Sequence, residues 1–199
     1  MKIIFIRHGE TEWNRAGRLQ GQTDVPLEET GRLQLKKTGE QLAISNITVD
    51  HILSSPLGRA LESAKIVAGK LQYPEEQIHT SPLFLERRFG ICEGMTYKEA
   101  IEHYPDNCFP GMESVEELVA RAKKAVDYCT QTYPGQTIIV TTHGAFLKAV
   151  IQYLTNGRID YFDHSVWADN GCYCIAESDN GSWSLALYNP KDNYMRQSV

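Results

Sequence analysis

Two histidines and two arginines stand where neighbouring strands of a sheet would end. Arg7 and His8 follow an apolar run at the start of the chain, and Arg59 and His143 each come soon after a later apolar run. Guanidinium groups match phosphate oxygens in bidentate fashion, and a neutral imidazole beside cations can attack phosphorus as a nucleophile. These residue types predict phosphoryl transfer through a phosphohistidine on His8, with the other three side chains around the phosphoryl group.

A proton donor is needed for the oxygen that leaves the phosphorus. Glu86 ends the apolar run 83–85 and is the carboxylate best placed for general acid, and later general base, work. His143 is expected to donate to the phosphoryl oxygens as charge shifts onto them. Alternatively, Glu86 forms a structural ion pair with Arg87 or Arg88. These two arginines are themselves candidates either for contacting an acidic substrate or for facing solvent.

Hydrophobic patterning indicates the elements that position these residues. Residues 3–6 and 138–140 are continuous apolar runs, which is typical of strands covered on both faces of a parallel sheet. A third strand is expected over residues 50–54. In such sheets ligands bind beyond the carboxyl ends of the strands, where helix N-termini also point free N–H groups and a partial positive charge.

Ser55 and Pro56 predict a helix start, because serine is a favoured N-cap and proline a favoured first helical residue. From there to Leu71, apolar residues recur at the period of a helix and fall on one face. Arg59 lies in the first turn of this predicted helix. A cation there opposes the helix dipole, which argues that an anion compensates it. Arg59 is therefore a candidate for binding phosphate, with a surface role on the helix as the alternative.

Two capping boxes predict further helix starts. In residues 114–117 and 96–99 a serine or threonine is followed three positions later by glutamate, and in this pattern both side chains satisfy free main-chain N–H groups. The helix after Thr96 is short, because it must stop before Pro105. Other elements are expected as follows: helices over 30–44 and 145–154, and a hairpin of strands over 172–177 and 182–188 around Asp179-Asn180-Gly181.

Strands that alternate with helices predict an α/β fold. We expect a three-layer α/β/α sandwich with a mainly parallel central sheet and an antiparallel edge from the terminal hairpin. The chain of 199 residues fits a single domain over residues 1–199. An edge strand near the C-terminus could pair between subunits, so both a monomer and a homo-oligomer fit the sequence.

Composition excludes several function classes. The net charge is −5, which is wrong for general binding of nucleic acid or of anionic membranes. The five cysteines follow no signal-peptide pattern, which favours a reduced, cytoplasmic location. No apolar stretch approaches the roughly 18 residues that cross a bilayer. Cys172 and Cys174 lack the second cysteine pair that would make a zinc site.

The segments around these positions resemble those of the histidine phosphatase superfamily, in its phosphoglycerate-mutase-like branch and of the broad-specificity phosphatase type. The resemblance covers residues 2 to about 189. It rests on the following segments: Arg7-His8-Gly9-Glu10-Thr11, Trp13-Asn14, Gly17-Arg18, Gln20-Gly21, 23–27, Gly31, 54–57, Arg59-Ala60, Glu86-Arg87, Phe89-Gly90, Glu93-Gly94, Glu113-Ser114, His143-Gly144 and Tyr188-Asn189.

The resemblance implies a phosphoglycerate mutase-like fold and a chemistry that needs no metal and no other cofactor. It also implies a role for each matching residue. These roles are His8 as the phosphorylated nucleophile, Glu86 as the proton shuttle, Arg7, Arg59, His143 and Asn14 as the phosphate pocket, Gln20 near the phosphoryl or leaving group, and Gly144 as a backbone N–H donor.

One segment departs from the mutases of the family. Eighteen residues separate Gly94 from Glu113, where those mutases carry a longer insertion that closes over the substrate. A mutase must exclude water to keep its phosphorylated intermediate, so a short lid over residues 95–112 favours hydrolysis. We therefore expect a metal-independent phosphomonoesterase that acts on small phosphorylated metabolites.

Several alternatives stay open. The runner-up is a cofactor-dependent phosphoglycerate mutase with the same site. A narrower phosphatase, acting on a cobalamin-pathway nucleotide or on a sugar bisphosphate, fits the same motifs, and a shallow site could admit a phosphorylated protein side chain. A non-catalytic regulatory module that only binds phosphate is the alternative from another class of protein.

Overall fold

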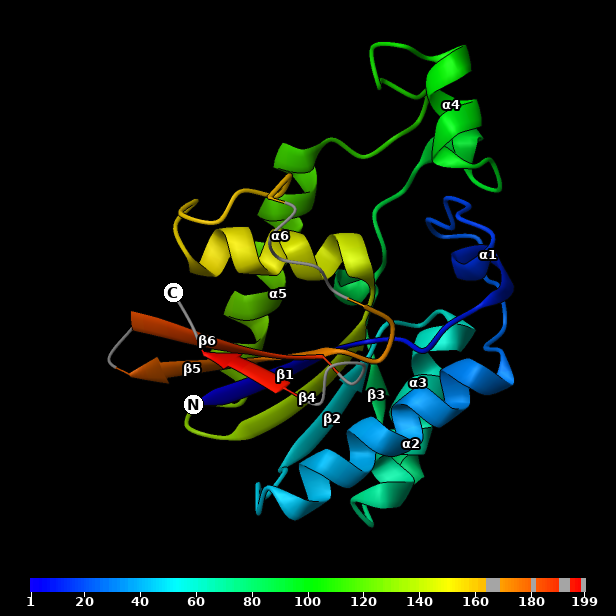
Figure 1. The fold of residues 1–199 in the computed structure, drawn as a ribbon. Coiled ribbons are helices and arrows are strands. Elements are labelled where there is room, and N and C mark those ends of the chain that lie inside the picture. The colour runs from blue at the N-terminus through cyan, green and yellow to red at the C-terminus, as the bar shows by residue number, and fades with distance from the viewer. Residues whose placement is uncertain (164–168, 180–181, 190–193, 198–199) are drawn as a thin grey trace.

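The structure is a computed structural model that describes residues 1–163, 169–179, 182–189 and 194–197. Among these residues, seven strands form one sheet in the order β3-β2-β4-β1-β5-β6-β7 (Figure 1). The strands are β1 (Lys2–Arg7), β2 (His51–Ser54), β3 (His79–Thr80), β4 (Thr137–Thr142), β5 (Tyr173–Asp179), β6 (Ser182–Asn189) and β7 (Tyr194–Gln197).

The sheet has a parallel and an antiparallel part. Strands β3, β2, β4 and β1 run parallel, and Ile3 of β1 pairs with Ile138 of β4. Strand β5 runs antiparallel to β1, and β6 and β7 continue this antiparallel edge. The mainly parallel sheet with an antiparallel edge is therefore confirmed. No pattern in the sequence predicted the short strand β3 or the strand β7.

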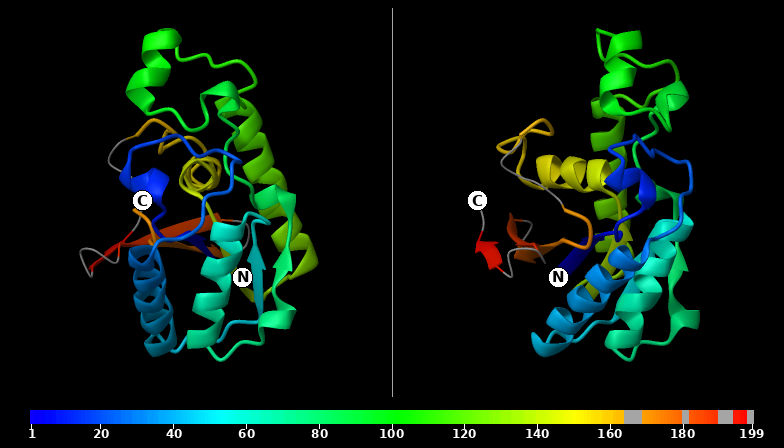
Figure 2. Two further views of the ribbon diagram at one scale, coloured as in Figure 1. Left: turned by 90° about the vertical axis from the view of Figure 1, so that its right-hand side faces the viewer. Right: turned by 45° about the vertical axis from the view of Figure 1, so that its right-hand side comes forward.

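Helices cover both faces of the sheet (Figure 2). One face carries α5 (Val115–Thr132) and α6 (Gly144–Leu154), and the other carries α2 (Glu29–Ile44) and α3 (Gly58–Lys70). Successive side chains of a strand point to opposite faces, so Ile3 and Phe5 of β1 pack with α5 and α6, whereas Ile4 and Ile6 pack with α2 and α3. All four side chains are fully buried, and this explains the continuous apolar run. The three-layer sandwich is confirmed.

The two predicted capping boxes are present. The Ser114 hydroxyl accepts from Glu117 N at the start of α5, and the Thr96 hydroxyl accepts from Glu99 N at the start of α4 (Tyr97–His103). In both, the glutamate carboxylate accepts a hydrogen bond from the main-chain N–H of the capping residue. A third capping box, which was not predicted, starts the short helix α1 (Glu12–Arg15).

The predicted start of α3 is wrong. Helix α3 begins at Gly58, and Ser55 is not its N-cap. Its first N–H groups are satisfied from a distant loop, because Asp24 accepts from Gly58 N at 2.6 Å and from Arg59 N at 3.4 Å. The Ser55 hydroxyl makes a long contact with Leu57 N, at 3.4 Å, and lies 2.8 Å from His143 Nε2. The first N–H groups of α3 are therefore capped by Asp24, which is distant in sequence.

Residues 89–112 form a cap that projects from the carboxyl ends of the parallel strands, with α4 at its far end (Figure 1). The cap has a small core of its own, made of Cys92, Ala100 and Phe109. Main-chain hydrogen bonds join it to the loop after α1: Leu19 N donates to Met95 O and Gly94 N donates to Leu19 O, both at 2.8 Å.

Within the part of the chain that the structure describes, no helix combines the length and the apolar character that a bilayer crossing requires.

Candidate active site

A cavity of about 430 Å³ lies between the carboxyl ends of β1 and β4 and the cap. It reaches solvent past Tyr97 and Phe162, which line it and are 54% and 57% exposed. The structure brings seven of the eight predicted site residues into its lining, and they are Arg7, His8, Asn14, Gln20, Arg59, Glu86 and Gly144.

His8 offers an unprotonated nitrogen. Its Nδ1 lies 2.7 Å from the carbonyl oxygen of Gly9, which can only accept, so the ring proton is on Nδ1. Its Nε2 carries the lone pair and accepts from Arg59 Nε at 3.3 Å. Burial, and then the charges of Arg59 and Arg7, hold the pKa of His8 well below its ordinary value. The ring is therefore neutral and able to act as a nucleophile.

Gly9 lets the loop after β1 lie directly on helix α2. A Cβ atom at Gly9 would collide with the main-chain oxygen of Gly31. Close contact is also supported by hydrogen bonds, because Gly9 N donates to Ser63 Oγ at 3.2 Å and Glu10 N donates to Gln34 Oε1 at 2.9 Å. The position of His8 is thus fixed by the helices on one face of the sheet.

Arg59 is the buried cation of the site, with only 1% of its surface exposed. Its Nη1 donates to Thr23 O at 2.8 Å and its Nη2 donates to Gly21 O at 2.7 Å. Asp24 Oδ1 lies 3.5 Å from Nη1, so Asp24 is an anion that balances this cation at the N-terminus of α3. The guanidinium joins the loop of Gly21 and Thr23 to the nucleophile His8.

His143 lies against His8 and is not part of the cavity lining. The two rings meet edge to face, with centroids 5.1 Å apart. Burial, and then the charge of Arg59, lower the pKa of His143 well below its ordinary value. Nε2 contacts Ser55 Oγ at 2.8 Å, and Nδ1 has no hydrogen-bond partner among the described residues. The Ser55 hydroxyl can donate to Nε2, and this leaves the proton of the neutral ring on Nδ1.

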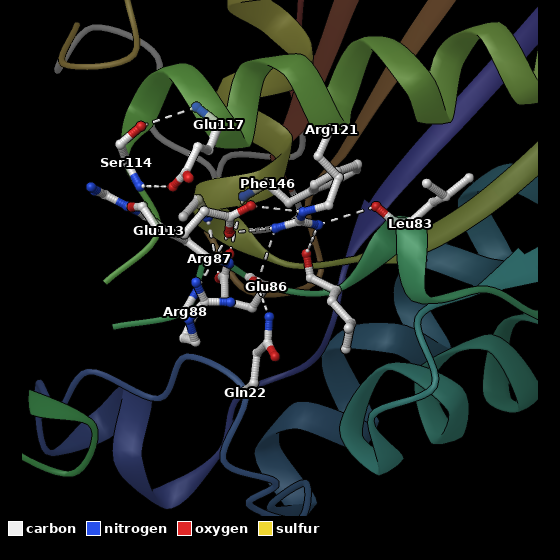
Figure 3. Close-up of polar contacts among 12 residues, drawn as sticks. Gln22, Leu83, Glu86, Arg87, Arg88, Glu113, Ser114, Glu117, Arg121 and Phe146 are labelled. Carbon is white, nitrogen blue, oxygen red and sulfur yellow. Dashed lines mark hydrogen bonds and ion pairs between the residues drawn. The ribbon is translucent and has the colours of Figure 1, made fainter. Parts of the chain in front are cut away.

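The Glu86 carboxylate binds the N-terminus of α6 (Figure 3). Oε2 accepts from Ala145 N at 3.2 Å, and Oε1 accepts from Phe146 N at 3.0 Å. Arg87 N donates to the same Oε1 at 2.8 Å. The first N–H groups of a helix are otherwise unsatisfied and carry partial positive charge, so they hold the carboxylate at the wall of the cavity.

The alternative in which Glu86 forms a structural ion pair with Arg87 or Arg88 is wrong, because neither guanidinium binds the Glu86 carboxylate. Arg87 Nε donates to Glu113 O at 2.8 Å, and the Arg87 guanidinium lies over the ring of Tyr161, 5.5 Å from its centroid. Arg88 Nε donates to Gly111 O at 2.7 Å. Of these two arginines, Arg87 lines the cavity and Arg88 does not.

Asn14 is oriented by three donors to its Oδ1. They are Thr11 N at 3.2 Å, Thr11 Oγ1 at 3.1 Å and Asn170 Nδ2 at 3.0 Å. The amide NH₂ group of Asn14 is thereby left for a ligand. Asn170 also donates to the main-chain oxygens of His8 and Gly9, at 3.1 and 3.3 Å. No local pattern in the sequence pointed to Asn170, because its contacts come from the other end of the chain.

Gln20 and Gly144 lie at the cavity as predicted. Gln20 is 6% exposed, and its Oε1 has no hydrogen-bond partner in the described part of the chain. A Cβ atom at Gly144 would lie 3.2 Å from the guanidinium of Arg7, so glycine leaves room for that cation beside the start of α6. The role of Gly144 as a backbone N–H donor stays a prediction.

Comparison with known proteins gives the family of this chain. The sequence profile of the histidine phosphatase superfamily (branch 1) matches residues 3–191. The chain belongs to the histidine phosphatase superfamily. This superfamily member is 34% identical to "Uncharacterized phosphatase PhoE" of Bacillus subtilis, over 94% of this chain and 93% of that protein. It is 33% identical to "Metal-independent phosphoserine phosphatase" of Arabidopsis thaliana, over 77% of this chain and 68% of that protein.

The fold of this histidine phosphatase superfamily member is similar to that of solved relatives. The structure of Bacillus stearothermophilus YhfR matches with a TM-score of 0.84 and 28% sequence identity, over 94% of this chain and 95% of that one. Several other relatives are named probable phosphoglycerate mutases. The phosphoglycerate mutase-like fold is confirmed, and relatives bear the names of both phosphatases and mutases.

Part of the cavity wall of this superfamily member was not predicted from the sequence. Lys148 lines the cavity one helical turn beyond Gly144, and the helical period was a usable signal because residues four apart share a face. Burial and the charge of Arg7 lower the pKa of Lys148. Asn107 and Tyr161 also line it, and neither lies in a motif.

Because its two active-site imidazoles are buried, we expect the stability of this superfamily member to depend on pH. An unfolded histidine binds a proton below about pH 6.5, whereas His8 and His143 are held neutral in the fold because burial lowers their pKa values. The unfolded state then binds more protons, so the free energy of unfolding falls as the pH drops below about 6.5, with a slope that approaches about 1.4 kcal/mol per pH unit for each histidine.

Urea unfolding at a series of pH values between about 5.5 and 7.5 measures this slope. The His143→Asn variant removes one of the two groups and is expected to have a shallower slope than the wild type. Equal slopes in the two proteins would contradict the neutral state of buried His143.

Proposed function

We propose that this protein is a metal-independent phosphomonoesterase that hydrolyses small phosphorylated metabolites through a phosphohistidine intermediate on His8. The observation that carries the proposal is the state of His8: its Nε2 is unprotonated, lines the cavity and lies 3.3 Å from the Arg59 guanidinium. A phosphoryl group that enters the cavity meets a nucleophile and a cation together. A cavity of about 430 Å³ is of the size that holds small molecules.

In the first step, the lone pair of His8 Nε2 attacks phosphorus and the bond from phosphorus to the ester oxygen breaks. Protonated Glu86 gives its proton to the departing oxygen, so that a neutral alcohol leaves. Arg7 and Arg59 neutralise the phosphoryl oxygens, and Asn14 donates to them through its NH₂ group. His143 lies behind the cavity lining and against the ring of His8. Its Nδ1 proton has no acceptor among the described residues, so it can donate to the phosphoryl oxygens once the phosphoryl group is bound to that ring.

In the second step, the Glu86 carboxylate takes a proton from a water molecule, and the water oxygen attacks phosphorus. The bond from phosphorus to Nε2 breaks, inorganic phosphate leaves, and His8 and Glu86 return to their starting states. Gln20 lies where it can contact the leaving group or the water, because its buried Oε1 faces no partner in the described part of the chain. The charge that a metal would otherwise neutralise is met by Arg7 and Arg59.

Hydrolysis is favoured over mutase activity because the cap is short and the cavity reaches solvent. Tyr97 of the cap is 54% exposed although it lines the cavity. A phosphoenzyme under this cap is accessible to water, whereas a mutase must keep water from its intermediate. Residues 95–112 act as a minimal lid in a single domain that spans the chain.

Release of inorganic phosphate from a panel of phosphomonoesters, phosphoglycerates included, tests the proposal. With a metal chelator present, the wild-type protein is expected to turn over several small esters. Interconversion of phosphoglycerate isomers that is faster than phosphate release would favour a mutase instead. Binding of inorganic phosphate without turnover of any ester would favour a binding module.

Glu86→Gln tests the acid and base role. Two esters of similar size serve as probes: benzyl phosphate, whose alkoxide must be protonated as it leaves, and para-nitrophenyl phosphate, whose phenolate leaves unaided. We expect kcat/KM for benzyl phosphate to fall about 100-fold or more and kcat/KM for para-nitrophenyl phosphate to change less than about ten-fold. Because kcat/KM reports only the first chemical step, the base role in the second step does not obscure the comparison.

The same variant is expected to show a burst of nitrophenol equal to the enzyme concentration, since loss of the base slows hydrolysis of the phosphoenzyme more than its formation. Equal losses of kcat/KM on the two esters would contradict the acid role of Glu86.

A further inference from the structure

Arg121, on α5, uses every N–H group of its guanidinium on one cluster of acceptors (Figure 3). Nη1 donates to the main-chain oxygens of Leu83 at 3.1 Å and Leu85 at 2.7 Å. Nη2 donates to Glu86 O at 3.2 Å. Nε and Nη2 also bind the two oxygens of Glu113, at 2.9 and 2.7 Å. A guanidinium has five N–H donors, and all five are engaged.

Glu113 connects this guanidinium to the chain that follows Glu86. Its carboxylate binds Arg121 in bidentate fashion and also accepts from Arg88 N at 3.4 Å. Its main-chain oxygen accepts from Arg87 Nε at 2.8 Å, and its main-chain N–H donates to Arg88 O at 2.9 Å. The segment of residues 83–88 is therefore held on both sides of Glu86 by one partly buried ion pair.

Phe146 brings α6 into the same arrangement. Its ring lies 5.2 Å from the Arg121 guanidinium carbon, and its main-chain N–H donates to Glu86 Oε1 at 3.0 Å. Arg121 thus contacts the main-chain oxygen of Glu86 on one side and the residue that binds the Glu86 carboxylate on the other. Gln22 Nε2 supplies a further bond to Glu86 O, at 3.1 Å.

We propose that Arg121, held by Glu113, is a positioning residue that sets the place of the Glu86 carboxylate for proton transfer. The proposal rests on the acid and base role proposed above for Glu86. Arg121 does not line the cavity, so it acts on the reaction through Glu86 and not through the substrate.

Proton transfer is sensitive to such positioning, because a displacement of about 1 Å at a reacting group can lower the rate about 100-fold. Lysine at position 121 would keep the positive charge for Glu113. It has three donors on one nitrogen and lacks the planar fork, so it cannot reach Leu83, Leu85 and Glu86 at the same time. Arg121→Lys therefore removes the arrangement while keeping a cation beside the buried carboxylate.

The test compares Arg121→Lys in the wild-type and Glu86→Gln backgrounds. In the wild type, we expect kcat/KM for benzyl phosphate to fall about 30-fold to 100-fold and kcat/KM for para-nitrophenyl phosphate to change less than about three-fold. In the Glu86→Gln background, the same substitution is expected to change both values less than about three-fold, because the group that it positions is absent.

A matched control is Lys123→Met on the same helix. Lys123 pairs with Asp127 at the surface and makes no contact with the segment of Glu86 that the structure records, so both kinetic values should stay within about two-fold of the wild type. Thermal unfolding checks that the variants are folded. If Arg121→Lys fails to fold, Glu113→Gln takes its place in the same comparison of wild-type and Glu86→Gln backgrounds. Glu113→Gln weakens the bidentate pair from the other side.

The outcomes separate this proposal from the proposed function. Equal losses on the two esters in the Arg121→Lys variant, or losses that multiply with those of Glu86→Gln, would show a general structural role and overturn the proposal, while the leaving-group dependence of Glu86→Gln alone still supports the acid role. If Glu86→Gln itself shows no leaving-group dependence, the acid role of Glu86 in the proposed function is contradicted, and the proposal for Arg121 loses its basis.

Discussion

His8→Ala is expected to lower kcat/KM for para-nitrophenyl phosphate by about 10,000-fold or more, because removal of a nucleophile costs that order of magnitude in enzymes. The loss should not depend on the leaving group, since no phosphoenzyme can form. The substitution also removes the ring that His143 and Arg59 contact, but the surrounding strands are fixed by apolar packing, and the fold should persist. Phosphate release and far-ultraviolet circular dichroism measure the two effects.

His51→Ala is the control for this variant. His51 starts β2 at the opposite end of the sheet, where its ring packs against Tyr133 with centroids 4.4 Å apart. This substitution should leave kcat/KM within about two-fold of the wild type, because surface changes away from the site have small effects. A His8→Ala protein that keeps more than a few per cent of the activity would contradict the nucleophile assignment.

Arg59→Lys is expected to have the second largest effect, a loss of kcat/KM of about 100-fold to 1,000-fold, the range seen when one donor to a developing oxyanion is removed. Lysine keeps the charge, but one nitrogen cannot face His8 Nε2 while also donating to Gly21 O and Thr23 O, as the guanidinium does. Orthovanadate, which mimics the five-coordinate phosphorus of the transition state, should inhibit the variant more weakly by a similar factor.

The matched control is Arg32→Lys. Arg32 donates through Nε to Glu62 on the surface of the molecule, and its replacement should leave turnover and vanadate inhibition unchanged within about two-fold. Arg59→Lys with unaltered vanadate inhibition would contradict a direct role of Arg59 at the phosphoryl group. Loss of activity together with loss of the folded state would call for the same measurement in a stabilising osmolyte.

Much of the fold was predictable because its signals are local. The buried strand β1 is a continuous apolar run, since Ile3 and Ile4 are each covered by a helix layer. The starts of α4 and α5 follow from capping boxes in which residues three apart bind one another. Such contacts depend on neighbours in sequence and need no knowledge of the tertiary structure.

Features that depend on distant segments were not predictable. The N-terminus of α3 is capped by Asp24, and no sequence rule connects these two segments. Asn170 orients Asn14 across nearly the whole chain, and Arg121 holds Glu86 from another helix. Lys148 was missed for a different reason, because the helical period could have placed it one turn after Gly144.

The candidate site was predictable to the extent that its residues follow strands. The carboxyl ends of β1 and β4 place Arg7, His8 and His143 side by side, as parallel strands must. The sequence left the partner of Glu86 ambiguous. The structure resolves it in favour of the N-terminus of α6, because a carboxylate satisfies helix N–H groups that would otherwise be unpaired.

The most direct test of the phosphohistidine mechanism is to trap the phosphoenzyme. The Glu86→Gln protein is mixed with para-nitrophenyl phosphate and quenched in alkali, and the phosphorylated residue is located by mass spectrometry. We predict one phosphoryl group per chain on His8, stable to alkali and lost in acid as a phosphoramidate is, and none in the His8→Ala protein. A phosphoryl group on another residue, or rapid turnover with no phosphoenzyme at any quench time, would contradict this mechanism.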